Sequence, residues 1–416
     1  MSGIWSRWRG LAMALFLALV LAGAWVATRP AATPLLGTVR LSLDPGAEVN
    51  AALDVRRHRL FLVNAGVVWT LDTHHGALVR VVRAGTAYTQ ALDGPASALD
   101  ERRGRLYIPN LIDDTLAVLD AASGRVRHIL HVGHQPDEVA VDTRTGRVFV
   151  GSTADWTLTT LDARTNRTLS TRPFAAGDLP GQLVVAPLTG RGFAAGYGGQ
   201  VTLFDARTGQ PLRGVVPAHG HLIEGLTVDG PARRVLGLIE NVPAVVLLDA
   251  RTAALLRVVL VGQDPTALAV DPATDRAFVA DGGDGMVSVL GLPRGRVLRR
   301  VPVGPTPLLT VDTQRGRVVV ASATGVSLLD ACSGRLVGRW PLALTPVALL
   351  VDARSGHILL VDGDAPTSGR GGAPWTWLRR LLWRWVPALP PPRAALPAIP
   401  ARLLVVSERL VPATNQ

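Results

Sequence analysis

The sequence lacks lysine altogether and contains a single cysteine, although it is 416 residues long. All 43 basic residues are therefore arginine, and with 32 acidic residues the formal net charge is +11. Arginine suits the recognition of phosphate or carboxylate groups, but GC-rich coding explains its use equally well. The lone Cys332 excludes an internal disulfide, a Cys-x-x-Cys-His haem attachment and a multi-cysteine zinc site.

Charged residues are also scarce. They make up 18% of the chain, too little for a disordered protein, whereas the hydrophobic 48% is ample for a core. One long apolar run, residues 11–27, follows Arg7 and Arg9. Its 17 residues are few for a membrane span and many for the apolar part of a signal peptide. We predict that residues 1–27 are a signal peptide or membrane anchor and that residues 28–35 are a linker. Both alternatives export the rest of the chain, either secreted or anchored facing outside.

A repeat of roughly 42 residues fills most of the remaining sequence. Its best copy reads Glu138-Val-Ala-Val-Asp142, Thr-Arg-Thr-Gly-Arg147, Val-Phe-Val-Gly151 and then Trp156-Thr-Leu-Thr-Thr-Leu-Asp162. Short runs rich in β-branched residues between turn residues indicate strands. Each copy therefore predicts four short strands, and we expect aspartates at strand ends to accept N–H groups of the next turn.

Two aspartates mark the copies of this repeat. The first recurs at Asp54, Asp100, Asp142, Asp229, Asp271, Asp312 and Asp352, with Pro187 assigned to the remaining copy. The second recurs at Asp72, Asp120, Asp162, Asp205, Asp249 and Asp330, and is replaced by Gly291 in one copy. The spacing predicts an all-β fold, a single β-propeller of about eight four-stranded blades, with seven blades as the alternative.

The two ends of the repeat region predict how the ring closes. Gly37–Leu43 reads as a fourth strand with no preceding three, and the last copy lacks a fourth strand after Leu403–Ser407. Pairing Thr38–Leu43 with Leu403–Ser407 would remove both open edges. The propeller is therefore predicted over residues 36–416, with a Trp- and Pro-rich insertion at 365–401 inside the last blade.

The repeat resembles a known family. The pattern Pro-x-x-Val-Ala-Val-Asp, Gly-Arg-Val-Phe-Val and Leu-Asp-Ala-Arg-Thr is similar to the YVTN β-propeller repeats, which occur in YncE-like exported surface proteins of bacteria and archaea. The resemblance covers Leu36 to about Asp364. It implies a propeller fold and export, but says little about activity because such repeats serve many roles.

The insertion in the last blade combines tryptophans with arginines. Trp375, Trp377, Trp383 and Trp385 would suit contact with a membrane interface, in addition to the N-terminal segment. The alternative is a helix packed on the propeller.

Candidate ligand-binding residues lie before the first strands. His134 and His221 each precede the first-strand aspartate by eight residues, and Gln263 has the same register. Asp137, Glu138 and Glu224 follow closely. We predict a metal or polar-ligand site at the mouth of the central channel, with solvated loop histidines as the alternative, and we assign no individual metal ligands.

Arginine is concentrated in the turns at the other end of the predicted ring. The candidates for contact with an anionic surface are Arg57, Arg103, Arg144, Arg147, Arg167, Arg234 and Arg315. Anionic lipid headgroups would attract such residues near a bilayer, whereas ordinary solvated turns are the alternative.

Motifs that carry chemistry are missing from the sequence. It contains no Gly-x-Ser-x-Gly, His-Glu-x-x-His or phosphate-binding glycine loop. We therefore expect a monomeric binding or scaffold protein for an unknown protein or polyanionic partner, without catalysis, cofactor or nucleic acid. The alternative is a lactonase-type hydrolase, which would require a divalent cation at the channel mouth.

Overall fold

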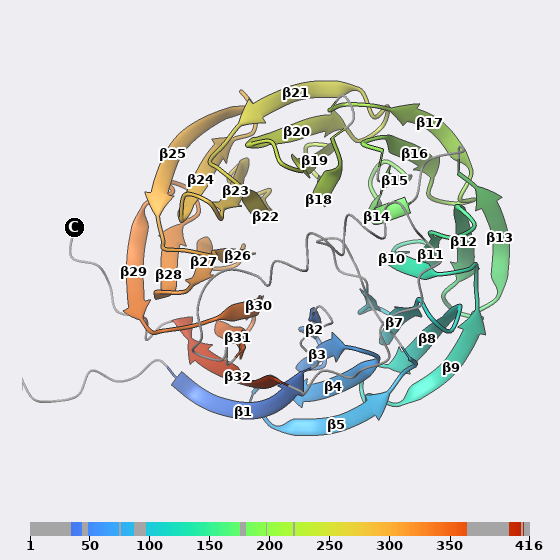
Figure 1. The fold of residues 1–416 in the computed structure, drawn as a ribbon, viewed down its shortest axis with the longest axis horizontal. Helices are drawn as coiled ribbons and strands as arrows, with labels where there is room; N and C mark the ends of the chain where they lie inside the picture. The colour runs from blue at the N-terminus through green and yellow to red at the C-terminus, as the bar shows by residue number, and fades with distance from the viewer. Residues whose placement is uncertain are drawn as a thin grey trace, which may run out of the picture. The chain divides into compact units, whose positions relative to one another are not determined.

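Four-stranded antiparallel sheets make up nearly all of the chain that the computed structural model describes. The described residues are 35–43, 49–74, 76–86, 97–174, 180–196, 198–218, 221–363, 399–408 and 411, and they belong to a unit formed by residues 35–416. Their 32 strands form eight sheets, and none of these residues is in an α-helix. The sheets are the blades of a β-propeller ring (Figure 1). The prediction of eight blades is confirmed, and the seven-bladed alternative is wrong.

The blades are numbered in chain order, and their strands are A to D from the inside outward. Blade 1 contains β2 (Asn50–Asp54), β3 (Arg59–Asn64), β4 (Val67–Asp72) and β5 (Leu78–Arg83). Blade 2 contains β6 (Ala98–Asp100), β7 (Arg105–Asn110), β8 (Thr115–Asp120) and β9 (Val126–His131). Blade 3 contains β10 (Pro136–Asp142), β11 (Arg147–Ser152), β12 (Thr157–Asp162) and β13 (Thr168–Pro173). Blade 4 contains β14 (Pro180–Ala186), β15 (Arg191–Gly196), β16 (Val201–Asp205) and β17 (Pro211–Val215).

The second half of the ring repeats this plan. Blade 5 contains β18 (Ile223–Asp229), β19 (Arg234–Ile239), β20 (Ala244–Asp249) and β21 (Leu255–Leu260). Blade 6 contains β22 (Pro265–Asp271), β23 (Arg276–Asp281), β24 (Met286–Gly291) and β25 (Arg296–Pro302). Blade 7 contains β26 (Leu308–Asp312), β27 (Arg317–Ser322), β28 (Gly325–Asp330) and β29 (Leu336–Pro341). Blade 8 contains β30 (Pro346–Asp352), β31 (His357–Gly363), β32 (Ile399–Ser407) and, from the other end of the chain, β1 (Leu35–Leu43).

Strand β1 closes the ring as the outermost strand of blade 8. It runs antiparallel to β32, with Thr38 opposite Leu404 and Leu43 opposite Ile399. The predicted pairing of these segments is confirmed, but the partner strand is longer than expected because it begins at Ile399. Because β1 and β32 pair with each other, the edges with which they face each other do not remain unpaired.

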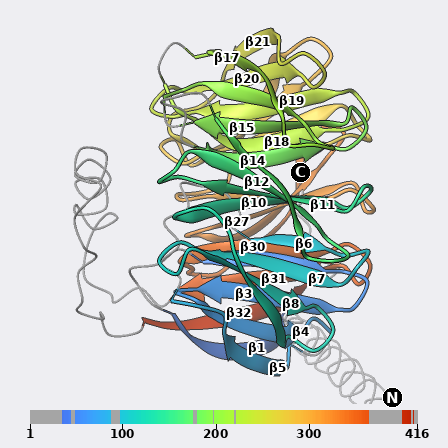
Figure 2. The ribbon, with the colours of Figure 1, turned by 90° about the vertical axis from the view of Figure 1, so that its right-hand side faces the viewer.

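The turns sort onto two ends of the ring, which Figure 2 shows edge-on. Turns between strands A and B and between C and D lie at one end, here the AB/CD end. Turns between B and C, and the connections from each D strand to the next A strand, lie at the other, the BC/DA end. β31 ends at Gly363 and β32 begins at Ile399, so the chain leaves and re-enters blade 8 at the BC/DA end. The predicted insertion and its four tryptophans fall almost wholly outside the described residues.

The core lies between neighbouring blades. Strands B and C are buried over almost their whole length, which explains their continuous apolar runs. Phe149 of blade 3, for example, packs against Phe204 of blade 4, with ring centroids 5.1 Å apart. The D strands are largely exposed, and the A strands facing the channel are mostly half-buried and apolar.

One register assignment from the sequence is wrong. In blade 4 it is Ala186 that pairs with Arg191, as Asp142 pairs with Arg147 in blade 3. Alanine therefore takes the position of the aspartate, and Pro187 is the first residue of the turn. Proline is tolerated there because its fixed φ suits a turn and the position needs no N–H donor.

Candidate functional site at the channel mouth

Three consecutive A strands carry a long polar residue at the same position near the BC/DA end. These residues are Glu138, Gln182 and Glu224, and each pairs with the fifth residue of the B strand beside it. Strands β10, β14 and β18 are neighbours around the channel. The three side chains therefore start from matching positions in blades 3, 4 and 5. We call this set the mouth arc.

A β-bulge precedes or adjoins each residue of the mouth arc. In blade 5 the bulge contains Gly225, whose φ of +57° favours glycine. The backbone N–H of Leu226, in the same bulge, donates a hydrogen bond of 2.5 Å to Gln182 Oε1. Gln182 therefore links blade 4 to blade 5. Glu138 and Gln182 are buried, whereas Glu224 is half-buried.

Gln182 was missed by the sequence reasoning, and a signal for it was available. It lies four residues before Ala186, as Glu138 lies four before Asp142. With Pro187 aligned to the first-strand aspartates, Gln182 lies five residues before the reference, and the match to Glu138 is hidden by one residue. Glu224 lies five residues before Asp229 instead of four, because its bulge contains an extra residue.

His134 is held in its loop by two aspartates. Its Nδ1 lies 2.9 Å from Asp114 Oδ2, and its backbone N–H donates to Asp155 Oδ2 at 3.1 Å. The hydrogen bond to Asp114 raises the pKa of His134. Burial raises the pKa of Asp114, but the hydrogen bonds from Gln135 N–H and His134 outweigh it, so the pKa of this carboxyl is lowered. The imidazole remains largely exposed, at 73% of its side-chain area.

Gln263 occupies the loop position equivalent to His134. Its N–H donates to Asp284 Oδ2 at 2.8 Å, as the N–H of His134 does to Asp155. His221 is exposed at the entrance to blade 5. Across the described ranges, no contact joins the imidazoles of His134 and His221. Nor do three or more histidine, cysteine or acidic residues of those ranges form a group that could hold a metal ion.

The aspartates of the BC turns thus have a recurring structural role. They accept N–H groups of the connections between blades, as Asp114, Asp155 and Asp284 do. Asp362 follows the same rule, accepting the N–H of Thr345 at 2.6 Å. Asp137 is buried beside Glu138 on β10. The ligand-binding role predicted for His134, Asp137, Glu138, His221, Glu224 and Gln263 stays a prediction.

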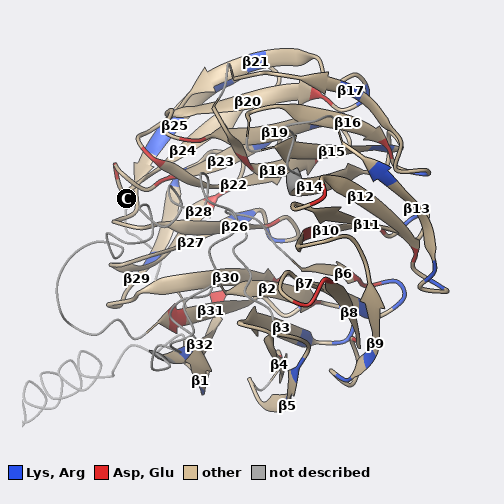
Figure 3. Cartoon of the chain, turned by 45° about the vertical axis from the view of Figure 1, so that its right-hand side comes forward, with Lys and Arg blue, Asp and Glu red and all other residues tan. Residues whose placement is uncertain are grey.

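Most candidate arginines of the AB/CD end are paired with aspartates. Arg57, Arg103 and Arg315 bind the buried aspartate three residues before them and also donate to a backbone carbonyl of the next blade. Arg147 pairs with Asp162 at 2.8 Å, and Arg234 lies 3.6 Å from Asp229 and from Asp275. Arg144 and Arg167 are exposed. Figure 3 shows further arginines on the outer strands, for example on β13, β21 and β25.

The described part of the chain contains no helix that is long and apolar enough to cross a membrane. The predicted signal or anchor at residues 1–27 and the linker up to residue 34 lie outside that part.

Comparisons with known proteins agree on the fold alone. No protein-family model matches the sequence, and no curated protein matches it. A solved structure of dihydro-heme d1 dehydrogenase NirN in complex with DHE is 15% identical, with a TM-score of 0.61 over 82% of this chain and 77% of that chain. BamB from Moraxella catarrhalis is 15% identical, with a TM-score of 0.56 over 79% and 94%. The computationally designed Ika8 protein is 18% identical, with a TM-score of 0.55 over 77% and 95%. The chain is an eight-bladed β-propeller, and these similarities carry no activity over to it.

Proposed function

We propose that this chain is an exported, non-catalytic binding propeller whose partner docks at the BC/DA end, over the mouth arc. The observation that carries the proposal is the matched placement of Glu138, Gln182 and Glu224 in three consecutive blades. Ligands of propellers characteristically use the mouth of the channel. Export and membership of the YVTN-type repeats belong to the same proposal, supported by the repeat pattern and by the apolar run at residues 11–27.

The chemistry of this end favours a basic partner. Its described acidic residues are Asp113, Asp114, Asp137, Glu138, Asp155, Glu224, Glu240, Asp264, Asp281, Asp284 and Asp362. Within the part of the chain that is described, arginine occurs there at the ends of D strands, as at Arg83 and Arg172, and at Arg402 of β32, which pairs with Asp362 at 2.8 Å. A concentration of one charge attracts ligands of the opposite charge and speeds their association. We therefore propose an arginine- or lysine-rich protein segment as the ligand class.

The test uses the full chain in a neutral detergent and a fluorescent peptide of alternating arginine and glycine, with a glutamate–glycine peptide as the reference. We expect the basic peptide alone to bind, and its affinity to fall as salt rises. Glu224→Gln should weaken binding by about tenfold, which corresponds to the loss of one charge-assisted contact.

Glu101→Gln, a half-buried glutamate of the AB/CD end, is the matched control and should leave the affinity unchanged. Equal weakening by both variants, or no binding of the basic peptide, would overturn the proposal. A stoichiometric divalent metal found by elemental analysis would favour the lactonase-type alternative instead.

A further inference from the structure

Blade 6 departs from the repeat at one position of the AB/CD end. In four sister blades the first arginine of strand B pairs with the aspartate that ends strand C. These pairs are Arg59–Asp72 at 2.6 Å, Arg147–Asp162 at 2.8 Å, Arg191–Asp205 at 3.3 Å and Arg317–Asp330 at 3.1 Å. In blade 6 the register is the same, but Arg276 of β23 lies opposite Gly291 of β24. The arginine is retained and the carboxylate is missing.

Arg276 has no replacement partner among the residues that the structure describes. Its Nε–H is buried and donates no hydrogen bond to any described residue, and its guanidinium forms no ion pair with a described carboxylate. The nearest acid in sequence, Asp275, lies 3.6 Å from Arg234 instead. A buried guanidinium N–H without an acceptor is costly, at about 1–3 kcal/mol for a typical unsatisfied group. An anion supplied from outside would remove this cost.

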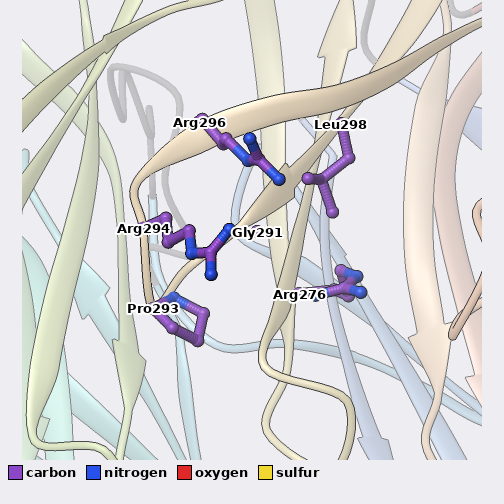
Figure 4. Close-up of a pocket in the computed structure, with 6 residues that line it drawn as sticks. All are labelled: Arg276, Gly291, Pro293, Arg294, Arg296 and Leu298. Carbon is purple, nitrogen blue, oxygen red and sulfur yellow. The ribbon is translucent and has the colours of Figure 1, made fainter.

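Beside Gly291 lies an open pocket whose empty volume of about 450 Å³ includes space open to solvent, and the Leu298 side chain lies against the position of the missing Cβ. It is lined by Arg276, Gly291, Pro293, Arg294, Arg296 and Leu298. Figure 4 shows three arginine side chains bordering it, Arg276 from β23 and the other two from the β24–β25 turn and the start of β25. Arg294 and Arg296 are exposed and form no ion pair within the described ranges. The pocket is therefore lined by three cations and no carboxylate.

The sister turns show what an anion in this pocket would replace. In blade 3, Asp162 Oδ1 accepts the N–H groups of Arg164 and Thr165, at 3.0 and 2.9 Å, while Oδ2 binds Arg147. In blade 6 the corresponding turn residues are Pro293, which has no N–H, and Arg294. An oxyanion at the same place could accept from Arg276 on one side and from the Arg294 backbone on the other.

We propose that this pocket, here the Gly291 pocket, binds a phosphate group. Arginine binds oxyanions through paired N–H donors, and three guanidinium groups match a phosphate with several charged oxygens better than a single carboxylate. Because the pocket is open, the phosphate can belong to a small soluble ester or to a lipid headgroup. The site lies at the AB/CD end and is independent of the basic partner proposed for the mouth arc.

The test is calorimetric titration of the full chain in neutral detergent with inorganic phosphate. Wild-type protein should bind one phosphate saturably, and Arg276→Gln should lower the affinity by at least about tenfold, the equivalent of one charge-assisted hydrogen bond. Gly291→Asp restores the sister sequence and should abolish binding while raising the melting temperature. A Cβ at Gly291 would lie 3.1–3.3 Å from Cδ1, Cδ2 and Cγ of Leu298, so aspartate fits once this side chain moves by a few tenths of an ångström. Arg317→Gln, which removes an arginine already paired with Asp330, is the matched control.

Phosphate binding that survives Gly291→Asp, or that Arg317→Gln weakens as much as Arg276→Gln, would overturn the proposal, as would no saturable binding to wild type. The source of the phosphate is decided by competition. Displacement by dihexanoyl-phosphatidylglycerol at lower concentration than by glycerol 1-phosphate identifies a lipid headgroup, and the reverse order identifies a soluble phosphate ester.

Discussion

At the scale of single residues, the AB turns are held by pairs of buried carboxylates and half-buried guanidinium groups. Asp100 is fully buried, accepts the N–H of Arg103 at 3.1 Å and pairs with its Nη1 at 2.8 Å. The same Nη1 donates to the carbonyl of Thr143 in blade 3. A guanidinium that closes its own turn and bridges to the next blade contributes more than a surface ion pair, because its partner carboxylate cannot reach water.

Arg103→Ala should therefore lower the free energy of unfolding by about 2 kcal/mol, since it leaves the buried Asp100 carboxylate without its cation. Arg144→Ala, an exposed arginine of the same end, should change it by less than about 0.5 kcal/mol. Urea unfolding followed by fluorescence measures both. Equal effects of the two substitutions would show that the Arg103 bridge adds nothing to stability.

A second residue-scale feature is the close contact between glycine and a polar side chain at the BC/DA end. Asp281 is buried and accepts a hydrogen bond of 2.6 Å from Ser288, and burial raises the pKa of this carboxyl. A Cβ on Gly262 would lie 2.4 Å from Asp281 Cγ. At Gly262, glycine is therefore required by space and not by a positive φ.

We expect Gly262→Ala to lower the free energy of unfolding by about 1–3 kcal/mol, the usual effect of overpacking a rigid site. Gly230→Ala is the control, because the only neighbour of its Cβ within 4 Å is Leu188 Cδ1 at 3.7 Å. Thermal unfolding of the two variants compares them directly, and a neutral Gly262→Ala would mean that Asp281 can move away.

At the scale of elements, the end of β32 carries a buried acid. Glu408 is 6% exposed, and its N–H donates to the carbonyl of Gly356 in the AB turn of blade 8. The charged groups facing it are Asp312, Arg315 and Arg317. Burial, followed by the charge of Asp312, raises the pKa of Glu408 from 4.5 to about 7.

The shift predicts a pH dependence with a definite sign. Between pH 4.5 and about 7 the folded protein keeps a proton that the unfolded chain has released. Stability from this group is therefore greatest below pH 4.5 and falls by about 3 kcal/mol as pH rises through this window. Urea titrations from pH 4.5 to 8 give the unfolding free energies of wild type and of Glu408→Gln. Their difference contains the contribution of Glu408, while the contributions of the histidines cancel. A constant difference across the range would contradict it.

At the scale of the whole molecule, stability depends on joining the two ends of the repeat region in one blade. Leu41 of β1 is 6% exposed and belongs to the same apolar cluster as Leu403 of β32 and Leu60 of blade 1. This cluster therefore connects the first and last parts of the described ring. Contacts so distant in sequence form only when the ring is complete.

Leu41→Asp should lower the free energy of unfolding by more than about 4 kcal/mol, because it buries a charge in this cluster. It should also free the edge of β32 and promote association between chains. Leu36→Asp, on the same strand but 50% exposed, is the control and should remain monomeric. Light scattering after size-exclusion chromatography measures association, and identical behaviour of the two variants would argue against closure through β1.

The repeat, a ring of about eight blades and the closing strand were predictable from the sequence, because short apolar runs, turn residues and aspartates recur at nearly constant spacing. The sequence also marked Gly291 as an exception. The matching positions of the mouth arc became visible only in the fold. A β-bulge adds a residue without changing the apolar pattern, so Glu224 matches Glu138 only in the folded register. Gln182 joins them once Ala186 replaces Pro187 as the reference. Likewise, the pairing of arginines such as Arg103 and the missing partner of Arg276 depend on how neighbouring strands and blades approach. Spacing along one chain cannot reveal these contacts, because they join residues that only folding brings together.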